Sequence, residues 1–377
     1  RLMPTVLCAP DKLRGALDAH EAAAALAAGA RLAGWDAIEH PLADGGEGTC
    51  DAIVRGRGGE TVAIATRDAI GRPRRAALGV LPDGTCVVEG AQANGLMHIP
   101  RNRRDVMRAS SGGIAPLILA ALDRGAPRIV IGLGGSATND GGLGLLIGLG
   151  AVATDAQGEP LRGRGADVTR VAAVDLAGLD PRIAQTQLIV AVDVDSPLAG
   201  PHGATRVFGP QKGATPDQVE QLDAGMARLA DLYGDRARRP GAGAAGGLGA
   251  ACFLLGAEPI PGAELVMRET RFADALARTD LVITAEGSVD AQSAATLPSA
   301  VSAAGKTVAR VASAAHDAGI PCVILGGRVD DDVEALYAAG ASAVLGIARG
   351  ARPIREALRQ TGPDLTAAAR AICTLRA

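Results

Sequence analysis

The strongest constraint on the fold of this chain is the alternation of short apolar runs with helical stretches in its C-terminal quarter. Runs that are apolar throughout indicate strands buried on both faces, as in a parallel sheet covered by helices. The predicted strands lie at 281–284, 322–325 and 343–347, and the predicted helices lie near 298–318, 330–339 and 364–373. A doubly wound α/β sheet satisfies this pattern.

The N-terminal residues begin the same pattern and leave it after two strands. Strands are predicted at Thr5–Cys8 and near Ala37–His40, and Asp18 is placed to cap an Ala-rich helix from about residue 19 to 33. This piece is too short to stand alone, and the C-terminal alternation lacks an obvious first unit. We therefore predict one Rossmann- or flavodoxin-like three-layer α/β domain built from residues 1–64 and 279–377.

The residues from 65 to 278 predict a second α/β domain that is inserted into the first. The turn Pro82-Asp83-Gly84 indicates a hairpin, so this part departs from a purely parallel sheet. Across this middle stretch, strands are predicted at 60–65, 76–81, 85–89, 128–132 and 187–192, and helices at 112–123 and 216–233. A cleft between two such domains is the expected place for a substrate.

Composition limits the kinds of ligand that this chain binds. Apolar residues make up 48% of it but aromatic residues only 2%, so Ala, Val, Leu and Ile must form most of the core. The net charge of −3 with dispersed basic residues excludes an electrostatic footprint for nucleic acid, and no apolar run is long enough to cross a membrane. Six scattered cysteines are typical of core residues in a reducing cytoplasm. We expect a cytoplasmic monomer or homodimer that acts on a small molecule.

Only three of the 38 basic residues are lysines, namely Lys12, Lys212 and Lys306. Each lies in a turn rich in Gly, Pro or Asp. A chain that uses Arg for nearly every surface charge is expected to keep Lys where a compact point charge is needed, which favours phosphate binding. The alternative explanation is a general preference of this sequence for Arg over Lys, with the three remaining lysines in loops by chance.

A predicted strand runs into the glycine-rich sequence Gly132–Gly142. Successive glycines let backbone N–H groups approach an anion, and the start of a following helix adds a partial positive charge. Gly132, Gly134 and Ala137 also satisfy the dinucleotide fingerprint, with Asp155 at a suitable distance for a ribose contact. The loop therefore indicates either a phosphate site or the dinucleotide loop of an NAD-linked oxidoreductase, and a tight strand-to-helix turn is the structural alternative.

Three pairs of acidic residues follow predicted strands: Asp44 with Glu47, Asp193 with Asp195, and Glu286 with Asp290. The carboxyl ends of strands in α/β sheets gather ligand groups. Phosphoryl transfer needs such carboxylates, because one holds Mg²⁺ and another orients or deprotonates the attacking hydroxyl. Each pair taken alone is equally typical of a turn or a helix cap.

Eight motifs spread over nearly the whole chain carry a family resemblance: Ala9–Gly15, Pro41–Thr49, Asp68–Pro73, Gly132–Gly142, Asp193–Leu198, Val207–Ala214, Gly241–Gly249 and Asp280–Gly287. With these motifs the chain resembles the type I glycerate kinases, bacterial enzymes that phosphorylate D-glycerate with ATP, and within them the glycerate 2-kinase branch. The resemblance implies a two-domain α/β kinase that uses ATP and Mg²⁺ and forms 2-phosphoglycerate and ADP.

The resemblance also implies roles for particular residues. Asp193 is expected to act as the base at the substrate hydroxyl, assisted by Asp44, and Lys212 to neutralise charge on the transferred phosphoryl group. Asp44 and Asp195 are expected to hold the metal ion. The residues expected to bind substrate are Arg14, Arg72, Asp195, Ser136 and Asn139, and those expected to bind the nucleotide are Gly134, Gly135, Ser136, Thr138, Glu286, Asp290 and Lys306.

The chain departs from the family pattern at a few positions. The family usually has Lys in place of Arg14, Asn in place of Ser196 and Arg in place of Ser288. About ten extra residues also precede Gly305-Lys306. A weakly active relative that binds a small hydroxy-acid is therefore an alternative, as is the oxidoreductase.

Overall fold

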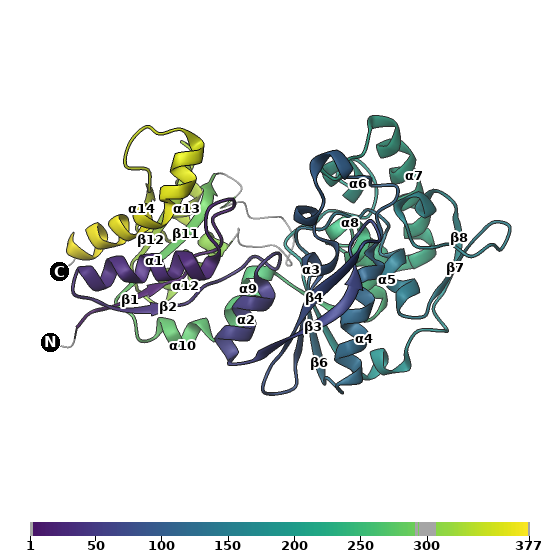
Figure 1. Cartoon of the computed structure of the whole chain (residues 1–377), viewed down its shortest axis with the longest axis horizontal. Helices are drawn as coiled ribbons and strands as arrows, with labels where there is room; N and C mark the ends of the chain where they lie inside the picture. Colours follow the sequence, from purple (N-terminus) through teal and green to yellow (C-terminus); the bar gives the residue numbers. More distant parts are fainter. Residues whose placement is uncertain (1–2, 291–292, 294–306, 376–377) are drawn as a thin grey trace. The chain divides into compact units, whose positions relative to one another are not determined.

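The computed structural model describes residues 3–290, 293 and 307–375 (Figure 1). The chain forms two compact units, each of which combines a sheet with helices. The described residues of unit 1 are those up to Asp44 and from Ala263 onward, and those of unit 2 run from Gly45 to Gly262. The junctions between the units thus lie earlier in the chain than the predicted junctions at 64/65 and 278/279.

Strand pairing explains the position of the first junction. The strand β3 (Glu60–Arg67) pairs along its whole length with β4 (Pro73–Val80), which belongs to the sheet of unit 2. The two ends of unit 2 lie close together, since a Cβ built on Gly45 would be 3.0 Å from the Cα of Gly262.

Unit 1 contains a parallel sheet in the order β13-β12-β11-β1-β2. The predicted doubly wound parallel sheet is therefore confirmed. The described elements are β1 (Thr5–Cys8), α1 (Ala19–Leu32), β2 (Asp36–Glu39), α9 (Gly262–Glu269), α10 (Phe272–Leu276), β11 (Leu281–Val289), α12 (Thr307–Asp317), β12 (Cys322–Val329), α13 (Glu334–Ala338), β13 (Ala343–Gly346) and α14 (Ile354–Leu375).

Helices cover both faces of this sheet. The helix α1 begins at the predicted cap, because the Asp18 carboxylate accepts the Glu21 N–H at 2.8 Å and the Glu21 carboxylate accepts the Asp18 N–H at 3.0 Å. Helices α1 and α14 lie side by side and bury Leu26 and Leu365 against the strands (Figure 1). The helix α12 packs against β11 and β12 as the third layer.

Unit 2 contains a mixed sheet in the order β10-β9-β6-β5-β4-β3. The strands β5, β6, β9 and β10 are parallel, and β4 pairs antiparallel with β5 through the predicted turn at Pro82–Gly84. Its other described elements are α2 (Thr49–Arg57), β5 (Cys86–Glu89), α3 (Gly90–Asn94), α4 (Ala115–Asp123), β6 (Arg128–Gly132), α5 (Leu143–Gly148), β7 (Val152–Asp155), β8 (Val171–Asp175), β9 (Gln187–Ala191), α6 (Ala204–Phe208), α7 (Pro216–Tyr233), α8 (Ala244–Leu254) and β10 (Glu258–Ile260).

The cores of both units consist mainly of aliphatic side chains. All six cysteines are buried free thiols, as the sequence predicted. Within the described residues, no helix combines the length and the hydrophobicity that crossing a bilayer requires.

The contact between α1 and α14 generates a stability prediction. A Cβ on Gly29 would lie 2.1 Å from the Thr366 carbonyl oxygen, so Gly29→Ala forces the two helices apart. We expect a loss of about 1–3 kcal/mol in the free energy of unfolding, because this overpacking outweighs the helix propensity of Ala. Urea denaturation measures this loss. The control is Gly346→Ala in β13, where an added methyl group meets no atom within 4 Å; equal effects of the two substitutions would contradict the packing argument.

Candidate active site

The candidate site of unit 2 lies at the carboxyl edge of three parallel strands. In the registers of β5 with β6 and of β6 with β9, Glu89 lies beside Gly132 and Gly132 lies beside Ala191. The loops that follow these strands therefore leave the sheet at one edge, where α/β proteins bind ligands. Two of these loops are the glycine-rich loop and the loop with Asp193 and Asp195.

The glycine-rich loop exposes its first residues and buries the later ones. Gly134 and Gly135 are exposed, whereas Ser136 is buried. The Gly134 N–H donates to the Gly45 carbonyl at 3.3 Å, and a Cβ on Gly134 would lie 2.6 Å from the Cα of Gly46. Two glycine-rich backbones thus run against each other, and this contact leaves no room for a side chain at residue 134.

Lys212 is buried beneath this loop and holds it. Its ammonium donates to the Ser136 hydroxyl at 3.1 Å and to the Thr138 carbonyl at 2.7 Å. Burial lowers the pKa of the Lys212 ammonium to about 7, although nearby Asp140 favours the charged form. The lysine that the sequence singled out therefore contacts the loop from inside the protein.

The remaining polar residues of the loop are also bonded in the interior. The Asn94 amide donates to the Thr138 hydroxyl at 3.3 Å, and the Asn139 amide donates to the Thr205 hydroxyl at 2.9 Å. Asp140 accepts the Ser111 hydroxyl and N–H, each at 2.7 Å. The side chains of Thr138 and Asn139 are fully buried and bonded to other protein groups. The structure therefore does not test their expected contacts with a ligand, which stay predictions.

Asp193 and Asp195 follow β9 at the same edge. Asp193 is exposed, and its carboxylate accepts the Gly262 N–H at 2.7 Å. Asp195 is half-buried. The N–H contact holds the Asp193 carboxylate in one orientation beside the glycine-rich loop.

Glu89 is a residue of this edge that the sequence reasoning missed. It ends β5, is buried, and accepts the N–H groups of Gly48 at 3.2 Å and Cys50 at 3.1 Å, so it caps α2 from another strand. Burial raises the pKa of Glu89 to about 7, even though these N–H groups favour its ionised form. The sequence feature that could have indicated Glu89 is its position directly after Val87 and Val88, at the end of a predicted buried strand.

Unit 1 carries a second polar cluster, made of Asp11, Lys12, Asp44 and Thr307, which we call the Asp11 cluster. The Lys12 ammonium lies 3.1 Å from Asp44 and 3.5 Å from Asp11, and the Thr307 hydroxyl donates to Asp11 at 2.8 Å. Burial and the nearby Asp44 charge raise the pKa of Asp11. Burial alone would lower the pKa of Lys12, but the two carboxylates outweigh it and raise that pKa.

The Asp11 cluster lies beside the middle of β11, because the Asp11 N–H donates to the Ala285 carbonyl at 2.9 Å. Glu286 is the next residue of this strand, which continues to Val289, beyond the predicted 281–284, and Asp290 directly follows the strand. The Ser293 hydroxyl donates to Glu286 at 3.4 Å, and the Ser293 N–H donates to Asp290 at 3.2 Å. Arg14 is exposed in the loop after the cluster. Lys306 lies outside the described residues.

Arg72 belongs to unit 2 and is oriented by its neighbours. Its Nε donates to Asp68 at 2.5 Å, and its Nη2 donates to the His98 carbonyl at 2.9 Å. Asp68 is buried and also accepts the Arg72 N–H at 2.9 Å. The guanidinium is therefore held in one direction.

The donor set of these loops suits a hard cation that shares its ligands with phosphate. In the described part of the chain, no group of three His, Cys, Asp or Glu side chains could hold a metal ion. Mg²⁺ commonly uses only one or two carboxylates together with phosphate oxygens. The carboxylate of Asp195 in unit 2 and that of Asp44 in unit 1 each supply oxygen ligands of the kind that such a cation takes.

Comparison with known proteins identifies the family. A model of the glycerate kinase family matches residues 6–377. The chain belongs to the glycerate kinase family. Members are phosphotransferases that act on an alcohol group, and this chain is an enzyme of that class.

Related glycerate kinases match over almost their full lengths. The chain is 39% identical to a glycerate kinase of Bacillus subtilis (strain 168) and 37% identical to a glycerate 2-kinase of Escherichia coli (strain K12), and each alignment covers 97% of this chain and 96% of the relative. A solved structure of a candidate glycerate kinase 2 from Salmonella typhimurium LT2 matches with a TM-score of 0.84 and 36% identity, covering 99% of this chain and 98% of the other.

The kinase family favours phosphoryl transfer over the oxidoreductase alternative. Asp155, the residue considered for a ribose contact, lies in β7, which pairs with β8 in a separate sheet. Its carboxylate accepts the N–H groups of Gln157 and Glu159, each at 3.0 Å. Asp155 thus stabilises its own turn.

The buried ammonium of Lys212 predicts a pH dependence of stability. Its pKa is about 7 in the folded chain, against 10.5 for a lysine exposed to water, so between these values the unfolded chain binds the extra proton. Burial of the charged ammonium therefore lowers the free energy of unfolding by its full amount below pH 7, and this penalty is lost as the pH rises toward 10.5. We expect the free energy of unfolding of the wild type, relative to Lys212→Met, to be flat below pH 7 and to rise from pH 7 to 9. Urea denaturation at several pH values from 6 to 9 measures this difference. If the difference in the free energy of unfolding between the two proteins does not change with pH, the prediction is contradicted.

Glu89 predicts a difference between two substitutions. Glu89→Ala leaves the N–H groups of Gly48 and Cys50 without their acceptor, and we expect a loss of roughly 2–4 kcal/mol in the free energy of unfolding. Glu89→Gln keeps an oxygen for both N–H groups and should cost under about 1 kcal/mol. Urea denaturation at pH 7 distinguishes them, and equal losses would show that the cap contributes little.

Proposed function

We propose that this chain transfers the γ-phosphoryl group of ATP to the 2-hydroxyl of D-glycerate and releases 2-phosphoglycerate and ADP. One observation carries the proposal: the exposed backbone of Gly134 and Gly135 and the exposed carboxylate of Asp193 leave the same edge of one sheet. Phosphoryl transfer needs an anion cradle and a group that orients the attacking hydroxyl. The E. coli relative is named a glycerate 2-kinase, which supports the 2-position.

In this proposal Asp193 accepts the proton of the attacking hydroxyl. The N–H of Gly262 fixes the direction of its carboxylate, so the base does not need to be ordered when substrate binds. Arg72, already oriented by Asp68, pairs with the carboxylate of glycerate, and Arg14 is the other candidate for this contact.

The glycine-rich loop receives the phosphate groups of the nucleotide. The N–H group of Gly135 is proposed to donate to the transferred phosphoryl group. Gly134, whose own N–H donates to the Gly45 carbonyl, gives the nucleotide close access to the loop backbone, and Ser136 completes the loop from its buried side. Lys212 acts as a positioning residue, because its ammonium already contacts Ser136 and Thr138 from inside. Its partial positive charge lies directly behind the cradle.

Mg²⁺ bound with the nucleotide would neutralise phosphate oxygens. Asp195 in unit 2 is one proposed ligand of the ion. Asp44 in unit 1 is the other, and as a ligand it would exchange its contact with the Lys12 ammonium for a contact with the ion. Glu286 within β11 and Asp290 directly after this strand are proposed to bind the nucleotide from unit 1. The buried free thiols support a reducing, cytoplasmic location.

The test is a coupled assay of ADP release with D-glycerate and Mg-ATP. Asp193→Asn removes the base while keeping the size of the side chain, and we expect kcat to fall by about 100-fold or more. The control is Asp217→Asn, the same change on the exposed first turn of α7, which should leave kcat within about twofold.

Phosphorus NMR of the product in the same assay distinguishes 2-phosphoglycerate from 3-phosphoglycerate. If wild-type protein turns over but Asp193→Asn keeps kcat within about threefold, the role of Asp193 as the base is wrong. Absence of turnover with D-glycerate and related small hydroxy-acids would overturn the proposed function itself.

A further inference from the structure

Unit 2 contains two adjoining cavities that none of the proposed substrate or nucleotide contacts line. The larger has a volume of about 510 Å³ and lies between the β3–β4 turn and the short helical turn Ser111–Ile114. The smaller has a volume of about 390 Å³. Arg108, Arg162 and Arg164 line both cavities, so the two form one recess, which we call the arginine pocket.

Positive charge dominates the arginine pocket. Arg67 joins the three shared arginines on the wall of the larger cavity, and Arg170 joins them on the wall of the smaller one. All five side chains are exposed. Among the described residues, Arg108, Arg162 and Arg164 have no carboxylate within ion-pair distance.

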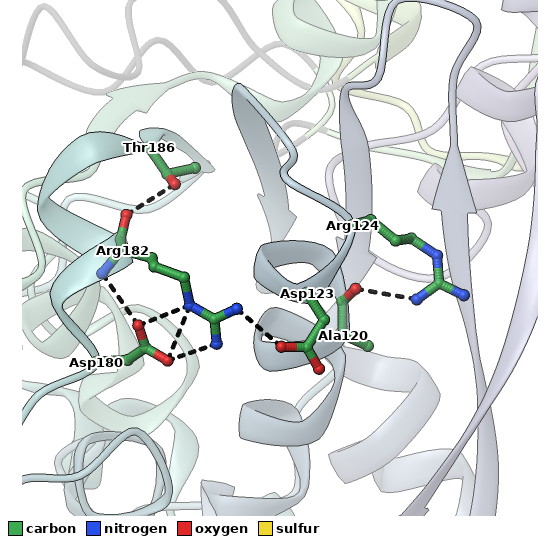
Figure 2. Close-up of polar contacts among 6 residues, drawn as sticks. All are labelled: Ala120, Asp123, Arg124, Asp180, Arg182 and Thr186. Carbon is green, nitrogen blue, oxygen red and sulfur yellow. Dashed lines mark hydrogen bonds and ion pairs between the residues drawn. The ribbon is translucent and has the colours of Figure 1, made fainter.

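Arginines elsewhere in unit 2 are neutralised by carboxylates. Figure 2 shows Arg182 between Asp180 and Asp123, with Nη2 2.7 Å from Asp180 and Nη1 2.8 Å from Asp123. Arg206 likewise pairs with Glu220 and Asp223. Arg170 on the pocket wall is likewise paired with Asp167, whereas Arg108, Arg162 and Arg164 form no ion pair with any described carboxylate.

The two carboxylates on the pocket walls are already used. Asp68 accepts the Nε of Arg72 at 2.5 Å and two backbone N–H groups. Asp167 accepts the N–H groups of Arg162 and Arg164 and lies 2.9 Å from the Arg170 guanidinium. These backbone bonds orient the Arg162–Arg164 turn without neutralising its side chains, so the positive charge of the pocket is available to an anion.

The shape of the recess selects among anions. Guanidinium groups from three separate segments can bind two distinct anionic groups bidentately. Small apolar residues, Ala69, Ile70, Pro73 and Pro116, line the larger cavity, and no aromatic side chain among the described lining residues could stack a nucleotide base. These features match a short carbon chain that carries two different anionic groups.

We propose that the arginine pocket binds a small phosphorylated carboxylic acid at a site separate from the catalytic edge. Arg162 and Arg164 contact one anionic group, and Arg67 and Arg108 contact the other. The pocket wall adjoins the glycine-rich loop, because Ser111 next to wall residue Ser110 donates to Asp140. The hydrogen bonds from Ser111 to Asp140 would therefore connect the wall of the occupied pocket to that loop.

Isothermal titration calorimetry of the full chain with 2-phosphoglycerate tests the site without requiring turnover. The pocket variant is Arg162→Gln/Arg164→Gln, and the control Arg182→Gln/Arg206→Gln makes the same change in charge at ion-paired arginines outside the pocket. We expect two binding events in the wild type. One event should weaken by roughly tenfold or more in the pocket variant and by less than about twofold in the control. The kcat for D-glycerate should stay within about twofold in both variants.

Two further probes define the ligand class. Inorganic phosphate and D-glycerate each carry one of the two anionic groups, and each should bind the pocket roughly tenfold more weakly than 2-phosphoglycerate. Equal affinity for inorganic phosphate would overturn the assigned class. An unchanged binding isotherm in the pocket variant, or a selective loss of ATP affinity in that variant, would overturn the proposal. Neither outcome depends on whether the chain phosphorylates glycerate, whereas the second binding event of the wild type rests on the proposed function.

Discussion

The parallel pairing of β5, β6 and β9 is the constraint on which the candidate site of unit 2 depends. Parallel strands that pair in register end together, so the loops after them are brought to one edge however far apart they lie in the sequence. Glu89, Gly132 and Ala191 are joined in this way. A shift of one strand by a single residue would turn its side chains to the opposite face and separate the glycine-rich loop from Asp193.

Buried charged groups then fix the shape of the loops. Lys212, Glu89 and Asp140 are each buried, and each is bonded to backbone of the glycine-rich loop or of the Gly45–Cys50 segment. Burying such groups is unfavourable unless hydrogen bonds compensate. Glycine-rich segments have few side chains to pack and high freedom when unfolded, so these polar contacts supply the rigidity that an anion cradle needs.

Elements with strong local signals could be predicted from the sequence. Asp18 caps α1, and α7 and β6 have the predicted bounds, because a capping residue, amphipathic spacing and a β-branched run act within a few residues. The pair β7–β8 was missed because its strands are short and partly exposed. The burial of Lys212 beneath Ser136 joins residues 76 positions apart, and the cap that Glu89 forms on α2 joins residues 41 positions apart. No local pattern encodes contacts at such separations.

The closeness of Gly45 and Gly262 has a consequence for how this architecture can be altered. The chain enters and leaves unit 2 at almost the same point, so the intervening segment resembles a module set into a single loop of its host. Within the described residues, exchanging that module for the equivalent segment of another family member would cut the backbone at two neighbouring positions. Chimeric proteins built at these two glycines would therefore keep the sheet of each unit intact.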